Sequence, residues 1–164
     1  MNTKERIFLH YLRLNARAPL TEISKRTSIP VSTLFDRLKT LQEHLILKHT
    51  TLLDFEKLGY PCRAAIMLSV PLGHREDLRH YLETHEHVNS IFRINNGYDY
   101  FVDCIFTDMQ RAEQFIEDLE ARFQITDKKT HYIVQVIKNE EFLCNPLSNP
   151  QTPTRSLLDI KASL

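Results

Sequence analysis

The sequence predicts an α+β protein of two parts, a small bundle of three helices followed by an antiparallel sheet with helices on one face. Residues 1–50 contain three short amphipathic helical patterns, and residues 62–138 follow the order β-α-β-β-α-β. The charge is also divided, although the whole chain is neutral. Residues 1–50 carry nine Lys and Arg against four acids, a net of +5, and the other 114 residues carry 12 bases against 17 acids, a net of −5. Such asymmetry is typical of a nucleic-acid-binding module joined to a second part.

Hydrophobic spacing predicts helices over residues 4–14, 20–27 and 31–43. Proline disfavours helical geometry in the residue before it, so Pro30 should separate the second helix from the third by a tight turn. The second helix should also rest the stem of Arg26 on the bundle, with its charge near the helix C-terminus. The residues expected on the core faces are Phe8, Leu9, Leu12, Leu20, Ile23, Val31, Leu34, Leu38 and Leu41.

Two short helices joined by a tight turn are the unit that places a second helix in the major groove of double-stranded DNA. We expect Ser32 and Thr33 near bases or adjacent phosphates, and Arg37 at phosphate. Asp36 should pair with Lys39 or Arg37, or accept from a cytosine amine. A merely solvated helix face is the alternative. The complete set of candidate DNA contacts is Ser32, Thr33, Arg37 and Lys39, with Arg17, Lys25, Arg26 and Lys48 as phosphate clamps.

The second part should be a ferredoxin-like sheet with two helices on one face. Strands are predicted over residues 62–70, 88–95, 98–107 and 130–138, and helices over 74–86 and from Thr107 or Asp108 onward. The helix that begins near residue 108 should bury Ala112, Phe115, Ile116, Leu119 and Phe123. Apolar side chains on both sides of residues 66–70 and 133–137 indicate that the second face is also covered, which predicts a dimer.

Several functional classes are excluded by what the sequence lacks. Three glycines cannot supply a glycine-rich nucleotide loop, and three cysteines without a C-x-x-C pair indicate neither a disulfide framework nor a zinc site. The sequence His85-Glu86-His87 has no matching third ligand nearby, so we expect no metal and no cofactor. The longest apolar run, residues 64–68, is too short to span a bilayer, so we expect a cytoplasmic protein without a membrane partner.

The first 50 residues resemble the winged helix-turn-helix of the Lrp/AsnC transcription regulators, archaeal members in particular. The resemblance lies in Asn15-Ala16-Arg17, in Leu20-Thr21-Glu22-Ile23-Ser24 and in the run from Ile29 to Leu41 that contains Pro-Val-Ser-Thr-Leu-Phe-Asp-Arg-Leu. It implies a DNA-binding domain over residues 1–50 and an effector-binding and assembly (RAM) domain over 61–143. It also implies a homodimer or an octamer. Turn residues predict a linker over 51–60, and three prolines in a polar stretch indicate a proline-rich tail over 144–164.

Two short segments compare with family features in detail. Asn96-Gly97-Tyr98-Asp99 is similar to the family's Gly-x-Tyr/Phe-Asp segment, which implies that these four residues bind an amino-acid effector, with Asp99 anchoring its ammonium group. The alternative is that Asp99 serves the hairpin turn itself. Asparagine stands where the family usually has glycine. Leu45 likewise occupies the position of a family glycine, so either the third helix ends differently or the wing is short.

Two alternatives to a regulator are open at this stage. The chain could be a ligand-binding or assembly module whose helix-turn-helix no longer binds DNA. Sirohaem decarboxylases have a similar two-part architecture, but they carry a His-x-Tyr-x-Arg-like pattern and a nearby tryptophan. The present chain has Asn89-Ser90-Ile91-Phe92-Arg93 and no tryptophan, so we do not expect an enzyme.

Overall fold

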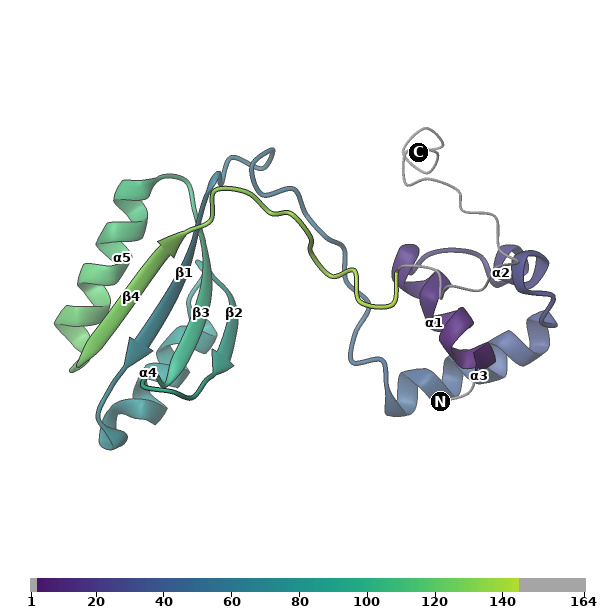
Figure 1. Ribbon diagram of the computed structural model, residues 1–164, viewed down its shortest axis with the longest axis horizontal. Helices are drawn as coiled ribbons and strands as arrows, with labels where there is room; N and C mark the ends of the chain where they lie inside the picture. Colours follow the sequence, from purple (N-terminus) through teal and green to yellow (C-terminus); the bar gives the residue numbers. More distant parts are fainter. Residues whose placement is uncertain (1–2, 145–164) are drawn as a thin grey trace. The chain divides into compact units, whose positions relative to one another are not determined.

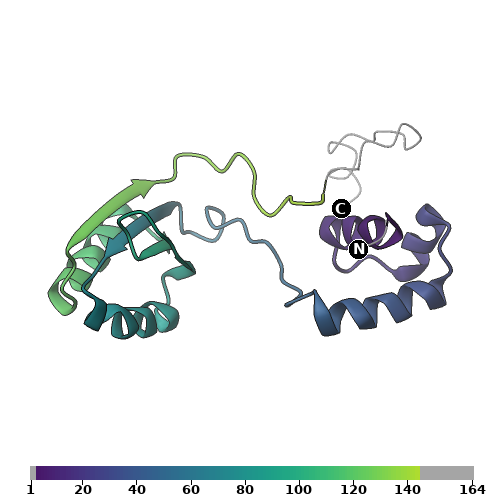
Figure 2. The same ribbon diagram turned by 60° about the horizontal axis from the view of Figure 1, so that its bottom comes forward.

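A computed structural model describes residues 3–144 of the chain. These residues form two compact units (Figures 1 and 2). The first unit contains residues 3–51 together with residues 138–144 of the described part. The second is the segment Leu52–Ile137.

The first unit is built on three helices, α1 (Thr3–Leu14), α2 (Leu20–Thr27) and α3 (Val31–His44), in agreement with the sequence. Two predicted core positions were wrong, because Val31 is 39% exposed and the side chain of Arg26 lies in solvent. The apolar stripe of α3 runs along the whole helix, and α2 is too short to cover all of that stripe. The buried residues of this unit are Phe8, Leu9, Leu12, Ile23, Ile29, Leu34 and Leu41.

The turn between α2 and α3 is fixed by local bonds. Ser28 adopts a left-handed conformation with φ of 56°, and its amide donates to the Ser24 carbonyl. Ile29 is buried at 5% exposure and anchors the turn in the core. Pro30 is the N-cap of α3, where its missing N–H costs no helical hydrogen bond. The turn therefore sets the direction in which α3 leaves the bundle.

The end of α3 settles the question raised by Leu45. Its φ is −134°, outside the left-handed region that favours glycine, and its amide donates to the Leu41 carbonyl. The amide of Ile46 donates to the same carbonyl. The helix thus ends in a way that a leucine can adopt. Within the described chain, no strand follows α3 before residue 62, so this segment is not folded as a β-hairpin wing.

The second unit is a four-stranded antiparallel sheet of order β2-β3-β1-β4, with α4 and α5 on one face (Figures 1 and 2). The predicted ferredoxin-like order is therefore confirmed. The elements are β1 (Cys62–Ser69), a short 3-10 turn (Leu72–His74), α4 (Arg75–Thr84), β2 (Val88–Arg93), β3 (Tyr100–Phe106), α5 (Met109–Arg122) and β4 (Asp127–Tyr132).

Alternation along the two central strands decides which side chains form the core of the sheet unit. Even-numbered residues of β1 and β3 face the helices, and odd-numbered residues face away from them. The Asp108 carboxylate accepts a hydrogen bond from the Arg111 amide at 2.8 Å. Asp108 is therefore the N-cap of α5. The largest fully buried side chains of this core are Phe106, Ile66, Leu68, Leu78, Leu82, Leu119 and Val102.

The predicted final strand was wrong in its position. It was expected over residues 130–138, but β4 pairs with β1 only over Asp127–Tyr132. The last bond between the two segments joins the Ile133 amide to the Arg63 carbonyl. Because β1 begins at Cys62, it offers no further backbone groups with which residues after 133 could pair. Val134 and Ile137 are 99% and 91% exposed, so residues 133–137 do not extend the second face of the sheet.

Residues 138–144 pack against α1 of the first unit, although the sequence placed residues up to 143 in the sheet domain. Arg13 donates from Nε to the Phe142 carbonyl at 3.2 Å and pairs with the Glu140 carboxylate and carbonyl. The ring Nδ1 of His10 lies 3.0 Å from the Leu143 carbonyl. Sequence patterns could not show these bonds, because they join residues about 130 positions apart. Residues 145–164, which make up nearly all of the predicted proline-rich tail, lie outside the described residues.

Candidate DNA-binding face and effector site

The N-terminal half of α3 presents a polar and accessible face. Ser32, Asp36 and Lys39 are exposed, and Thr33 is half-buried beside them. Phe35 adds an apolar surface that is 62% exposed. The fold thus leaves free the helix turns that a helix-turn-helix uses to contact base edges.

Arg37 lies differently from Ser32 and Lys39. Its Nη1 is 3.2 Å from the Glu5 Oε1 on α1, and its side chain is only 26% exposed. Of the three partners considered for Asp36, Arg37 is thus paired elsewhere, because α1 supplies its carboxylate. An arginine held in this way must leave Glu5 before it can contact a phosphate.

The remaining predicted phosphate contacts lie on the surface of the first unit. Lys25 and Arg17 are exposed, and Lys48 lies beyond the end of α3. Arg26 pairs with Glu22 one helical turn earlier at 2.7 Å. Both side chains of this pair are about half exposed, and exposed pairs contribute little stability, so Arg26 can exchange Glu22 for a phosphate at small cost.

The segment Asn96-Gly97-Tyr98-Asp99 forms the tip of the hairpin between β2 and β3. Asn96 and Gly97 have φ of 66° and 96°, the two consecutive positive values of a tight hairpin turn. Asparagine at the first position is thereby compatible with the turn. Tyr98 lies close to Asp127 at the start of β4, and hydrogen bonding to that carboxylate raises the pKa of the Tyr98 hydroxyl.

Asp99, the predicted ammonium anchor, already has partners on both carboxylate oxygens. Its Oδ1 is 2.6 Å from Arg75 Nη2, and its Oδ2 accepts from the Val70 amide at 2.9 Å. The side chain is only 12% exposed. Arg75 could not be predicted from the sequence, because a pair that joins the start of α4 to a hairpin 24 residues later leaves no local pattern.

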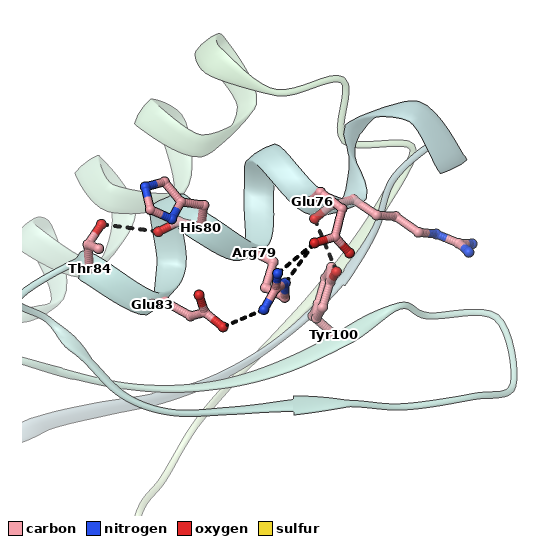
Figure 3. A network of polar contacts seen from close by, with 7 residues as sticks. Glu76, Arg79, His80, Glu83, Thr84 and Tyr100 are labelled. Atoms are coloured by element: carbon pink, nitrogen blue, oxygen red, sulfur yellow. Dashed lines mark hydrogen bonds and ion pairs between the residues drawn. The ribbon is translucent and has the colours of Figure 1, made fainter.

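Two further contacts fix the backbone of α4 beside this pair. The Tyr100 hydroxyl donates to the Arg75 carbonyl at 3.1 Å. Arg79 lies between two acids of the same helix, with bonds of 2.7 Å to Glu76 and 2.9 Å to Glu83 (Figure 3). The start of α4 is therefore held to β3 independently of the Arg75 side chain.

A second polar cluster, formed by Arg63, Asn89 and Asp103, lies on the open face of the sheet and was not predicted from the sequence. Arg63 donates to both oxygens of Asp103 at 2.7 and 2.8 Å, and the Asn89 amide donates to Asp103 Oδ2 at 2.7 Å. Asp103 is 7% exposed and is the one buried charged residue of the described chain. Hydrogen bonding to Asp103 raises the pKa of the Arg63 guanidinium, so the charged form of Arg63 is favoured.

Other chemistries find little support in the described residues. Within residues 3–144 no cluster of three or more His, Cys, Asp or Glu side chains could hold a metal ion. Burial raises the pKa of the Cys104 thiol to about 12, which keeps it from acting as a thiolate. No helix in this part of the chain is both long and apolar enough to cross a membrane.

Residues 63–142, which contain the sheet, the Arg75–Asp99 pair and the hairpin tip, match the family model of the Lrp/AsnC ligand-binding domain. Helix-turn-helix regulators match across both parts of the chain. Together these findings support an Lrp/AsnC family regulator. A helix-turn-helix transcriptional regulator of Pyrococcus furiosus is 24% identical to this chain over 143 residues, covering 87% of this chain and 96% of the relative. Regulator FL11 of Pyrococcus abyssi is 29% identical over 114 residues, covering 69% and 76% respectively.

Solved structures show the same fold. The regulator NMB0573 of Neisseria meningitidis, in complex with L-methionine, superposes with a TM-score of 0.79 at 24% identity, covering 85% of this chain and 93% of that one. LrpC of Bacillus subtilis superposes with a TM-score of 0.77 at 19% identity, covering 84% and 97%. At these identities the likeness concerns the Lrp/AsnC fold and does not assign a ligand.

Proposed function

We propose that this chain is a sequence-specific transcription regulator that binds double-stranded DNA through α3. The observation that carries the proposal is the exposed N-terminal half of α3, held by the α2–α3 turn in a unit with excess positive charge. The helix-turn-helix regulators among its relatives support it. Ser32 and Thr33 would contact bases or adjacent phosphates, while Arg17, Lys25, Arg26, Lys39 and Lys48 would contact phosphates.

A salt series separates this function from that of an assembly module without DNA binding. We expect affinity for selected DNA to fall steeply as salt rises, because bound cations release counterions from the duplex. Lys25→Ala should weaken binding to all sequences and reduce the salt slope by about one. Thr33→Ala should instead change the preference among sites. Gel shifts on DNA selected from a random pool measure all three, and an absence of binding at low salt would refute the proposal.

Arg37 provides a distinct test within the same face. If it leaves Glu5 to contact phosphate, Arg37→Ala weakens DNA binding, whereas Glu5→Gln strengthens it by releasing the guanidinium. If Arg37 only holds α1 against α3, both variants lower the thermal stability of the first unit. Neither would then change the salt slope. Thermal melts and gel shifts on both variants distinguish the two roles.

We further propose that the chain forms a homodimer through the open face of the sheet. Phe92 is 54% exposed on this face, and its ring packs against Phe101 at 6.0 Å between centroids. Ala65 and Ile105 lie on the same face around Asp103, whose charge is balanced by Arg63. A two-fold dimer pairs one patch with its own copy and presents two α3 helices to two half-sites. An octamer would assemble from such dimers.

The dimer predicts that a charge at Phe92 blocks assembly. We expect Phe92→Glu to elute and sediment as a monomer, because two such faces would bury unpaired carboxylates. Met109→Glu is the control, since Met109 is equally exposed at 58% but begins α5 on the opposite side of the sheet. Analytical ultracentrifugation compares the two, and a dimeric Phe92→Glu would place the interface elsewhere.

We propose that the second unit senses an α-amino acid at Asn96, Gly97, Tyr98 and Asp99, in a cytoplasmic protein without catalytic activity or cofactor. The methionine complex of the Neisseria relative supports this ligand class. An effector would change regulation only through a difference in its affinity for two assembly or DNA-binding states. Thermal unfolding in the presence of each amino acid tests the proposal, since a ligand of the folded state raises the midpoint.

A further inference from the structure

The Asp99 carboxylate, which is expected to bind the effector's ammonium group, is already paired with a cation of the same chain. Asp99 Oδ1 lies 2.6 Å from Arg75 Nη2, and Oδ2 is bonded to the Val70 amide. The Asp99 backbone is fixed as well, because its amide donates to the Leu68 carbonyl and its carbonyl accepts from the Ile94 amide. A ligand cannot draw Asp99 outward, so an ammonium group that pairs with Oδ1 competes with Arg75 for it.

Arg75 can be displaced more easily than Asp99. Its Nε is buried and has no hydrogen-bond partner among the described residues, although Nη2 is paired. A buried donor without a partner costs free energy in the closed state, and release of the side chain to solvent recovers it. The side chain is also 31% exposed, so the guanidinium has a route into water.

The rest of α4 need not move with the Arg75 side chain. The Tyr100 hydroxyl holds the Arg75 carbonyl, and Arg79 bridges Glu76 and Glu83 along the helix (Figure 3). The charged groups that surround the pair on the neighbouring turn are thus engaged with one another. Exchange at Asp99 is confined to one side chain.

We propose that Arg75 is the gate and the specificity residue of the effector site. The inference rests on the amino-acid response proposed above. An α-amino acid displaces the guanidinium, its ammonium group takes Asp99, and its carboxylate pairs with the released Arg75. One ion pair within the chain is exchanged for two ion pairs with the ligand.

This exchange selects zwitterions. An amine without a carboxylate replaces one cation by another and leaves Arg75 unpaired. An N-acetylated amino acid offers a carboxylate to Arg75 but leaves Asp99 without a cation. Leaving the largely buried Asp99 carboxylate unpaired is unfavourable, so the N-acetyl derivative loses to the closed Arg75–Asp99 pair. The amine exchanges one ion pair for another and gains no second one, so it binds more weakly than the amino acid.

The experiment compares three ligand classes on the full chain and on variants of it. Thermal unfolding midpoints are measured with each amino acid at millimolar concentration, with its decarboxylated amine and with its N-acetyl derivative. The wild-type chain should be stabilised more by at least one amino acid than by either of its two analogues. Arg75→Met removes the competing cation and the carboxylate's partner, so it should bind the amine at least as well as the amino acid.

Two variants serve as controls. Arg75→Lys keeps a cation beside the Asp99 carboxylate, so it should retain selection for the zwitterion. It also shows whether position 75 tolerates substitution, in case Arg75→Met does not fold. Arg79→Met removes an arginine of the same helix that does not contact Asp99, and it should leave ligand selection unchanged.

The outcomes separate the gate from the effector response. If the wild-type chain responds to an amino acid and Arg75→Met keeps the same selection, the gate is refuted and the response stands. If neither the wild-type chain nor Arg75→Met responds to any amino acid, the effector response itself is refuted. A response in Arg75→Met alone would show that free amino acids do not displace Arg75, and this would overturn the exchange.

Discussion

Leu34→Ala is expected to unfold the first unit and abolish DNA binding while leaving the sheet unit folded. Leu34 is fully buried near the start of α3, in the core that the three helices share. Truncating a buried leucine costs about 3 kcal/mol or more through lost transfer energy and the cavity left behind. A unit of this size has a total stability of roughly 3–7 kcal/mol. One substitution therefore removes much of the stability that keeps α3 in place.

Circular dichroism and amide hydrogen exchange should report the loss unit by unit. We expect exchange protection to disappear in α1 to α3 and to persist in β1 and β3. Phe35→Ala is the matched control, because Phe35 is the next residue of α3 and is 62% exposed. It should leave the melting curve of the first unit almost unchanged. A folded Leu34→Ala with wild-type protection in α3 would contradict the expected core.

The second large effect is expected at Asp103. Asp103→Ala removes the partner that Arg63 and Asn89 share on the open sheet face. Breaking one side of a largely buried ion pair costs about 3 kcal/mol, because it leaves the other charge uncompensated. We expect a large fall in the melting temperature of the sheet unit.

Replacing the pair as a whole distinguishes loss of a partner from loss of a contact. Arg63→Met combined with Asp103→Leu should be considerably more stable than Asp103→Ala, since apolar groups of similar size need no partner. Chemical denaturation of Arg63→Met, of Asp103→Leu and of the double variant gives the coupling energy. If the double variant loses as much stability as the sum of the two single ones, the proposed coupling is wrong.

Most elements of the fold could be predicted because their signals are local. The stripe Phe8, Leu9 and Leu12 has helical spacing, Pro30 marks the break before α3, and Asn96-Gly97 marks the hairpin. Each of these choices is made by neighbouring residues, so a single sequence displays it. The boundaries of β4 were misplaced because the apolar run 133–137 looks like a strand, whereas pairing ends where β1 begins.

The candidate site divides in the same way. Ser32 and Thr33 could be placed at the start of an accessible helix from spacing, and their contact with DNA stays a prediction. The partners of Arg37, Asp99 and Asp103 could not be predicted, because they lie 32, 24 and 40 residues away in the sequence. No periodic pattern connects charges over such distances.

The sequence by itself determined the two-part architecture, the order of helices and strands, and the division of charge between +5 and −5. Hydrophobic periodicity and turn residues act over a few positions, which is why they can be read along the chain. Only the tertiary structure decided which charges are free. It joined Arg37 to Glu5, closed Asp99 with Arg75 and attached residues 138–144 to α1. Ion pairs depend on distance in space, and folding sets that distance.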